Sequence, residues 1–249
     1  MTGFPKAAAT PALERSSRAS LRGELSVIAW WVLVGSGAGA LAGLVIGGIG
    51  GRLAMLLLRL TSSDIVIGLT SDDGFVMGVV STKTLSLLLL TTALGAANGA
   101  LYAALRVTIP TRLRLPLWSA LAGTAGGANF VHADGVDFTL VSPALLGIGL
   151  FVLLPAAAAA LVVTLVERWI GRPAWQDRRL SALVVGASLA STLALLPAAL
   201  VASFALAVRG AGLRERLVRA GRLAVPVALA AVAVVAGIDL VVEAGKILR

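Results

Sequence analysis

Five of the seven aspartates and the single histidine of this 249-residue chain gather in two polar segments, 61–74 and 132–137, between apolar stretches. Carboxylate and imidazole groups can bind a divalent cation, and neighbouring carboxylates can shift one another's pKa and so support proton transfer. Arginines lie close to these groups along the chain and could contact an anion. The candidate polar or ion site therefore comprises Arg52, Arg59, Asp72, Asp73, His132, Asp134 and Asp137.

A structural role competes with this interpretation, and the residue types favour it. Asp-Gly sequences form turns, and aspartates opposite arginines make ordinary ion pairs. One histidine excludes a two-histidine metal site within one chain, and the absence of cysteine excludes thiol catalysis and Cys-ligated zinc. We find no phosphate-binding glycine loop, nucleophile elbow or His-Glu-x-x-His motif. We therefore assign no catalytic residue, metal or cofactor.

Four further polar residues fall inside apolar stretches: Asn98, Tyr102, Asn129 and Asp239. We expect Asn98 and Asn129 to lie inside the protein and to join helices by hydrogen bonds. Asp239 has two interpretations. An acid within a membrane is costly and functional by default, but Glu243 and Lys246 follow closely, so a position at the headgroup level is equally consistent.

A glycine occupies every fourth position from residue 35 to 51, and shorter rows of small residues recur further along the chain. This glycine zipper predicts close backbone contact between helices, because small residues let two helices approach in lipid. Residues four apart drift around a helix, so the row forms a slanted groove. We expect its partners within the same chain, where the small-residue rows of the second and third spans, 85–105 and 116–131, supply matching surfaces. The helix-packing residues are Gly35, Gly39, Gly43, Gly47, Gly51, Gly95, Gly99, Gly123 and Gly127.

The composition places these residues in a membrane. Hydrophobic residues make up 58% of the chain and charged residues only 13%, whereas soluble proteins average roughly 25% charged residues. We predict an all-α, polytopic transmembrane bundle with six spans, at about 25–49, 85–105, 116–131, 140–166, 181–208 and 223–242. Residues 1–24 form a basic, polar segment that we expect to be disordered, and 25–249 form one transmembrane domain.

Basic residues and tryptophans indicate the orientation. With a cytoplasmic N-terminus and six spans, most Lys and Arg residues fall in the cytoplasm. All five tryptophans then lie at cytoplasmic ends, where we expect them at the headgroup level: Trp30, Trp31, Trp118, Trp169 and Trp175. Arg209 to Arg222 would lie outside. A re-entrant 181–208 segment, leaving five crossings and an external C-terminus, fits the charges better, but we favour six because a 28-residue apolar stretch spans easily.

The net charge of +9 is explained by arginines that flank spans, so we predict no nucleic-acid partner. Arginine-rich, Ala/Gly-rich composition favours a bacterial protein. We interpret the chain as a non-enzymatic, multi-pass protein of a bacterial inner membrane: a small transporter, a channel-like component or a structural component of a membrane complex. Its partners are the lipid bilayer and either other membrane proteins or further copies of itself. The alternative is a membrane-embedded enzyme or ion-binding protein that uses the acidic loops.

Overall fold

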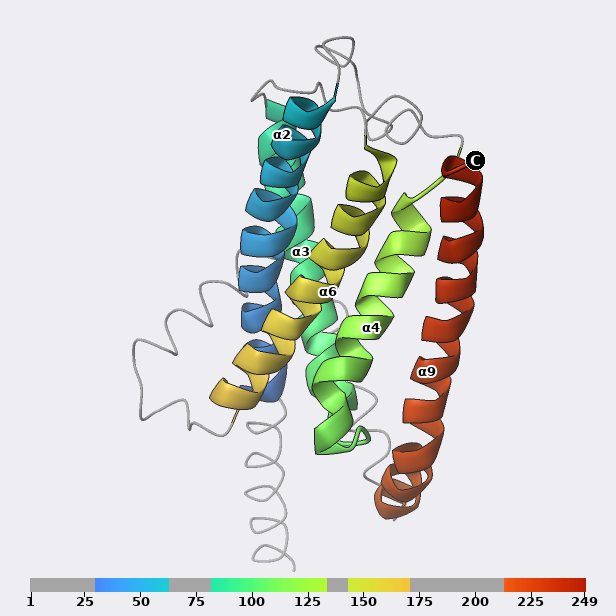
Figure 1. Ribbon diagram of the computed structural model, residues 1–249. Helices are drawn as coiled ribbons and strands as arrows, with labels where there is room; N and C mark the ends of the chain where they lie inside the picture. Colours follow the sequence, from blue (N-terminus) through green and yellow to red (C-terminus); the bar gives the residue numbers. More distant parts are fainter. Residues whose placement is uncertain (1–29, 63–81, 134–142, 171–212) are drawn as a thin grey trace, which may run out of the picture.

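The computed structural model describes residues 30–62, 82–133, 143–170 and 213–249. All regular structure in these residues is helical, which confirms the all-α prediction (Figure 1). Within this part of the chain, four helical segments are long and apolar enough to cross a membrane: Trp30–Thr61, Lys83–Leu105, Ala144–Trp169 and Ala224–Ile247.

The first helix runs from Trp30 to Thr61 and includes a π-helical stretch, η1 (Gly43–Gly50), followed by α2 (Gly51–Thr61). It is followed by α3 (Thr82–Leu105), α4 (Thr111–Phe130), α6 (Ala144–Trp169) and α9 (Leu213–Ile247). Three boundaries differ appreciably from those predicted. The first helix continues to Thr61, well beyond its predicted end at about residue 49. Helix α4 starts before Pro116, and α9 includes the basic residues up to Arg222, which continue the apolar helix without a break.

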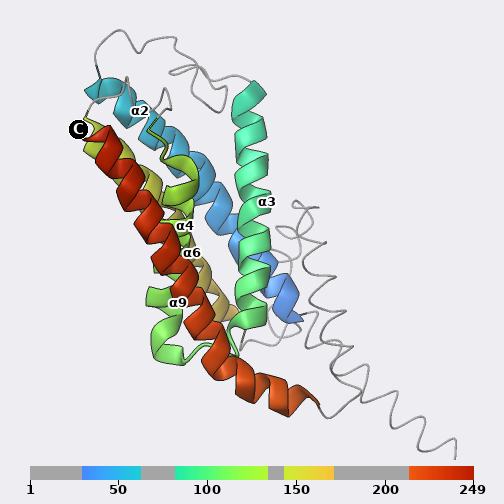
Figure 2. The same ribbon diagram turned by 90° about the vertical axis from the view of Figure 1, so that its right-hand side faces the viewer.

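Helices α2, α6, α4 and α9 lie side by side in this order, and α3 packs along the first helix (Figure 1). Helices α4 and α9 run parallel, because Gly221 lies against Thr108, Gly237 against Thr124, and Gly127 against Leu240. Consequently α6 ends and α9 begins at the same end of the bundle, and the C-terminus lies at the opposite end (Figure 2). The predicted fifth span, 181–208, lies outside the described residues, and six crossings are not confirmed.

The glycine row of the first helix lies directly against the backbone of α3. An ideal Cβ atom on Gly35 would be 2.5 Å from the carbonyl oxygen of Gly99, and one on Gly39 would be 2.8 Å from the carbonyl carbon of Gly95. At Gly43 the Cβ would be 2.9 Å from the carbonyl carbon of Thr91. Only glycine fits these three positions, because any larger residue would meet backbone atoms that cannot move aside.

The close contact ends within η1. A Cβ on Gly47 would meet only the Thr91 side chain, at 3.1 Å, and Gly51 has no such atom within 4 Å. Gly48, which is not part of the predicted row, is buried against Leu88 instead. A π-helix bonds each residue to the fifth along rather than the fourth, so the face that carries the row changes here.

The small residues of α4 contact helices other than the predicted one. Gly123 faces Val152 and Ala156 of α6, and Gly127 lies between Val152 and Leu240 of α9. They therefore do not complement the glycine row of the first helix, as we had expected, because α3 alone fills that groove.

We predict that Gly43→Leu prevents the monomer from folding, whereas Gly51→Leu is tolerated because the space beside Gly51 is open. Overpacking typically costs about 1–3 kcal/mol, and a leucine against backbone should lie at or above the top of this range. Thermal unfolding of the two purified variants in detergent checks the difference. Dissociation of an oligomer with intact monomers in Gly43→Leu would contradict packing within the chain.

Candidate functional site

A single carboxylate, that of Glu167 in the last turn of α6, joins three helices. Arg106 donates from Nε to Oε1 at 2.9 Å and from Nη2 to Oε2 at 3.0 Å, which is a bidentate pair. Arg114 donates from Nη1 to Oε2 at 2.9 Å. The Tyr102 hydroxyl donates to Oε1 at 2.8 Å. Both carboxylate oxygens therefore accept two hydrogen bonds each.

Local structure places each donor. Tyr102 and Arg106 are four residues apart and so share one face at the end of α3, where the Arg106 amide donates to the Tyr102 carbonyl. Arg114 lies in the first turn of α4, and its Nε also donates to the Ile109 carbonyl of the preceding connector at 3.2 Å. The Arg106 guanidinium also lies 5.7 Å from the centre of a Trp31 ring. The start of the first helix therefore contacts the cluster as well.

The cluster is partly withdrawn from solvent and contains two cations for one anion. The side chains of Arg106 and Arg114 are 14% and 16% exposed, and that of Glu167 is 29% exposed. Hydrogen bonding to Glu167 raises the pKa of the Arg106 guanidinium despite its burial. Because every oxygen of Glu167 is already bonded, the arrangement is suited to holding helix ends together rather than to relaying protons.

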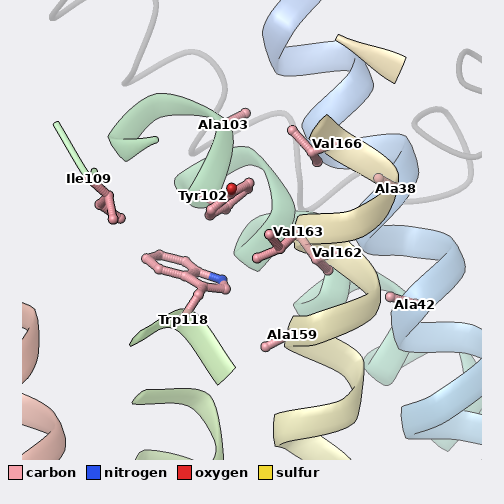
Figure 3. Packing of buried hydrophobic residues seen from close by; sticks show 10 residues of the cluster. All are labelled: Ala38, Ala42, Tyr102, Ala103, Ile109, Trp118, Ala159, Val162, Val163 and Val166. Atoms are coloured by element: carbon pink, nitrogen blue, oxygen red, sulfur yellow. The ribbon is translucent and has the colours of Figure 1, made fainter. Parts of the chain in front are cut away.

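A second polar contact lies beside this cluster. Trp118 of α4 donates its indole N–H to Asn98 Oδ1 of α3 at 2.9 Å. The Trp118 ring packs against Tyr102 with ring centres 5.3 Å apart, among buried residues of α3, α4, α6 and the first helix (Figure 3). Trp118 is only 3% exposed, so its ring is buried inside the protein, where its indole N–H finds its acceptor.

The predicted polar or ion site is not assembled by the residues that the structure describes. Arg52 donates from Nη2 to the Thr84 hydroxyl at 2.6 Å, and His132 Nε2 lies 3.0 Å from the Asn129 carbonyl. Arg59 is partly exposed in the last turn of α2. Asp72, Asp73, Asp134 and Asp137 lie outside the described residues. The described residues contain no group of three or more His, Asp and Glu that could hold a metal ion.

The remaining intramembrane candidates separate into buried and exposed residues. Tyr102 is fully buried and Asn98 is partly buried, whereas Asn129 is exposed at the end of α4 rather than inside the bundle. Glu243 accepts a hydrogen bond from the Ala133 amide at 3.1 Å and pairs with Lys246. Asp239 is exposed on α9 and makes no hydrogen bond or ion pair with any described residue.

Sequence reasoning missed Arg106, Arg114 and Glu167, which it treated only as basic and polar connectors between spans. One weak signal was present, because Tyr102 and Arg106 share a helix face and Glu167 directly follows an apolar stretch. Nothing in the spacing pairs residue 106 with residue 167. Comparison of the chain with protein-family models, curated proteins and solved structures found no match.

We predict that Glu167→Gln destabilises the protein by about 2 kcal/mol, because two partly buried guanidinium groups lose their counter-charge. Denaturant titration or thermal unfolding in detergent measures the effect. Arg168→Gln is the matched control, since Arg168 is the exposed neighbour in the same turn. Tyr102→Phe should cost less than Glu167→Gln, because it removes one hydrogen bond and no charge. Equal stability of Glu167→Gln and the unaltered protein would show that the cluster does not hold the helices together.

Proposed function

We propose that the chain is a non-enzymatic, multi-pass protein of a bacterial inner membrane and serves as a structural component of a membrane complex. The observation that carries this proposal is Asp239, an acid on the outer surface of an apolar helix with no partner among the described residues. Such acids in membrane helices are rare and usually meet a partner. Because no described residue of this chain pairs with Asp239, we propose that its partner lies outside the described bundle.

The interior of the described bundle favours a structural role over transport. The first helix and α3 meet backbone to backbone at Gly35, Gly39 and Gly43, which leaves no space between them. At one end, Glu167 ties α3, α4 and α6 together with both its oxygens occupied. These contacts support a rigid body that presents outer surfaces rather than one that opens a path through its centre.

We further propose five crossings with the N-terminal side in the cytoplasm. Basic residues gather at the end where α3 and α6 finish and where α4 and α9 begin, and the α9 residues Arg214, Arg216, Arg219 and Arg222 join them. This distribution agrees with the positive-inside rule if that end is cytoplasmic. The parallel course of α4 and α9 then puts the C-terminus on the external side, as in the five-crossing alternative.

A topology reporter tests this orientation. Alkaline phosphatase fused after Arg249 should be active, because the enzyme folds only outside the cytoplasm, and the same reporter inserted after Thr108 should be inactive. A cytoplasmic signal from the fusion after Arg249 would contradict five crossings and restore the six-span topology.

Reconstitution tests the structural role. Proteoliposomes that contain the purified protein should hold an imposed proton or potassium gradient as long as protein-free vesicles do, with gramicidin as the positive control. Gentle detergent extraction should yield a particle larger than the 249-residue monomer. Rapid gradient loss that depends on the protein would overturn the structural role in favour of a channel or transporter.

A further inference from the structure

The end of the bundle around Glu167 carries more positive than negative charge. Helices α3, α4 and α6 contain one acid between them, Glu167, and it already accepts hydrogen bonds from Arg106 and Arg114. Two further arginines at this end, Arg112 of α4 and Arg222 of α9, are exposed and make no hydrogen bond or ion pair with any described residue. Neutralising these two charges therefore takes an anion from outside the described bundle.

Contacts between α4 and α9 place Arg112 and Arg222 at nearly the same depth. The contacts that join α9 to α4 and to the connector before it all pair residues 113 positions apart, as in Thr108 and Gly221. Arg222 is therefore level with Ile109. Three residues, or about 4.5 Å along a helix axis, separate this level from that of Arg112. The two arginines thus lie on neighbouring helices within one turn of each other in depth.

The residues that follow the two arginines are apolar and exposed. Leu113 and Leu115 of α4 are each 47% exposed, and Val227 of α9 is 67% exposed. These three residues lie on the bilayer side of Arg112 and Arg222, because α4 and α9 both run from this end into the apolar bundle. The two charges therefore lie at the border of the apolar surface, which is where the headgroups of a bilayer begin.

Helix α9 brings additional positive charge to this end. Its first residue, Leu213, lies eight residues before Gly221, or about 12 Å of helix, so its first turns extend past the start of α4 (Figure 2). These turns contain three arginines and one glutamate. Together with Arg222 the arginines form a cluster next to an apolar helix, and such clusters are typical of segments that bind anionic lipids.

The start of α9 lacks a polar link to the bundle among the described side chains. At the opposite end, a hydrogen bond between Glu243 and the Ala133 amide ties α9 to the residues after α4. Near Arg222, the contact of α9 with Thr108 is made through a methyl group. A phosphate that accepts hydrogen bonds from both Arg112 and Arg222 supplies a polar link at this end as well.

We propose that the phosphate of an anionic phospholipid binds at this end, between Arg112 of α4 and Arg222 of α9. Guanidinium groups bind phosphate oxygens through strong, charge-assisted hydrogen bonds. The exposed apolar residues beside the arginines favour a lipid over a soluble phosphate, because they contact the acyl chains of the same molecule. The lipid contact requires neither the structural role nor a particular number of crossings, and so goes beyond the function proposed above.

Thermal unfolding in detergent with added lipid tests this site. Phosphatidylglycerol should raise the unfolding temperature more than the same concentration of phosphatidylcholine, whose choline group offsets the phosphate charge. Arg112→Gln and Arg222→Gln should each weaken the apparent affinity for phosphatidylglycerol about fivefold, the factor expected for the loss of one basic residue near a membrane surface. Arg249→Gln, at the opposite end of α9, is the matched control and should respond as the unaltered protein does.

The lipid response separates binding from folding. In phosphatidylcholine alone, both glutamine variants should unfold at the same temperature as the unaltered protein, because neither arginine has a partner among the described residues. Arg222→Lys, which keeps the charge, should retain most of the response to phosphatidylglycerol. Soluble glycerol phosphate should not stabilise the protein at concentrations where the lipid does, which distinguishes the lipid from free phosphate.

Four results would each overturn the lipid site. They are equal stabilisation by the two lipids, a full response of either glutamine variant to phosphatidylglycerol, an equal loss of response in Arg249→Gln, and equal stabilisation by glycerol phosphate alone.

Discussion

Direct backbone contact between the first helix and α3 is the constraint on which the described bundle depends. Gly35, Gly39 and Gly43 allow it, because any side chain there would meet the carbonyl groups of α3. In lipid, helices gain little from hydrophobic burial, so close dispersion contact and weak Cα–H···O bonds are the main sources of association. The contact aligns α3 so that Tyr102 and Arg106 reach the end of α6, and Arg106 lies over Trp31.

Polar contacts then stabilise the arrangement of helices that close packing sets up. Glu167 joins α3, α4 and α6 at one end, and the hydrogen bond between Trp118 and Asn98 adds a link between α3 and α4 one layer deeper. These groups are mutually satisfied, which limits what chemistry they can perform. In contrast, Asp239 is exposed on α9 and makes no hydrogen bond or ion pair with the described residues. Among the described residues, the end of the bundle around Glu167 is therefore tied together by polar contacts, whereas the exposed acid Asp239 lies on the side of α9.

Several features were predictable because they depend on local sequence. Composition and long apolar stretches are enough to indicate membrane helices, and spacing by four is enough to indicate a face made of glycine. The all-helical fold and four apolar spans followed from these patterns. The partners of the glycine row were only partly predictable: α3 fills the groove, whereas Gly123 and Gly127 of α4 pack against α6 and α9. Choice among similar small-residue surfaces depends on how all helices fit together.

The sequence by itself determined the class of protein, the approximate extent of most helices and the closeness of at least one helix pair, because each of these depends on residues within a few turns of one another. Only the tertiary structure decided that residues 102, 106, 114 and 167 meet, that α9 runs parallel to α4, and that Asp239 is exposed on α9. Each of these depends on contacts between residues far apart in the chain. Helical periodicity says which residues share a face, but the packing of neighbouring helices selects what that face meets.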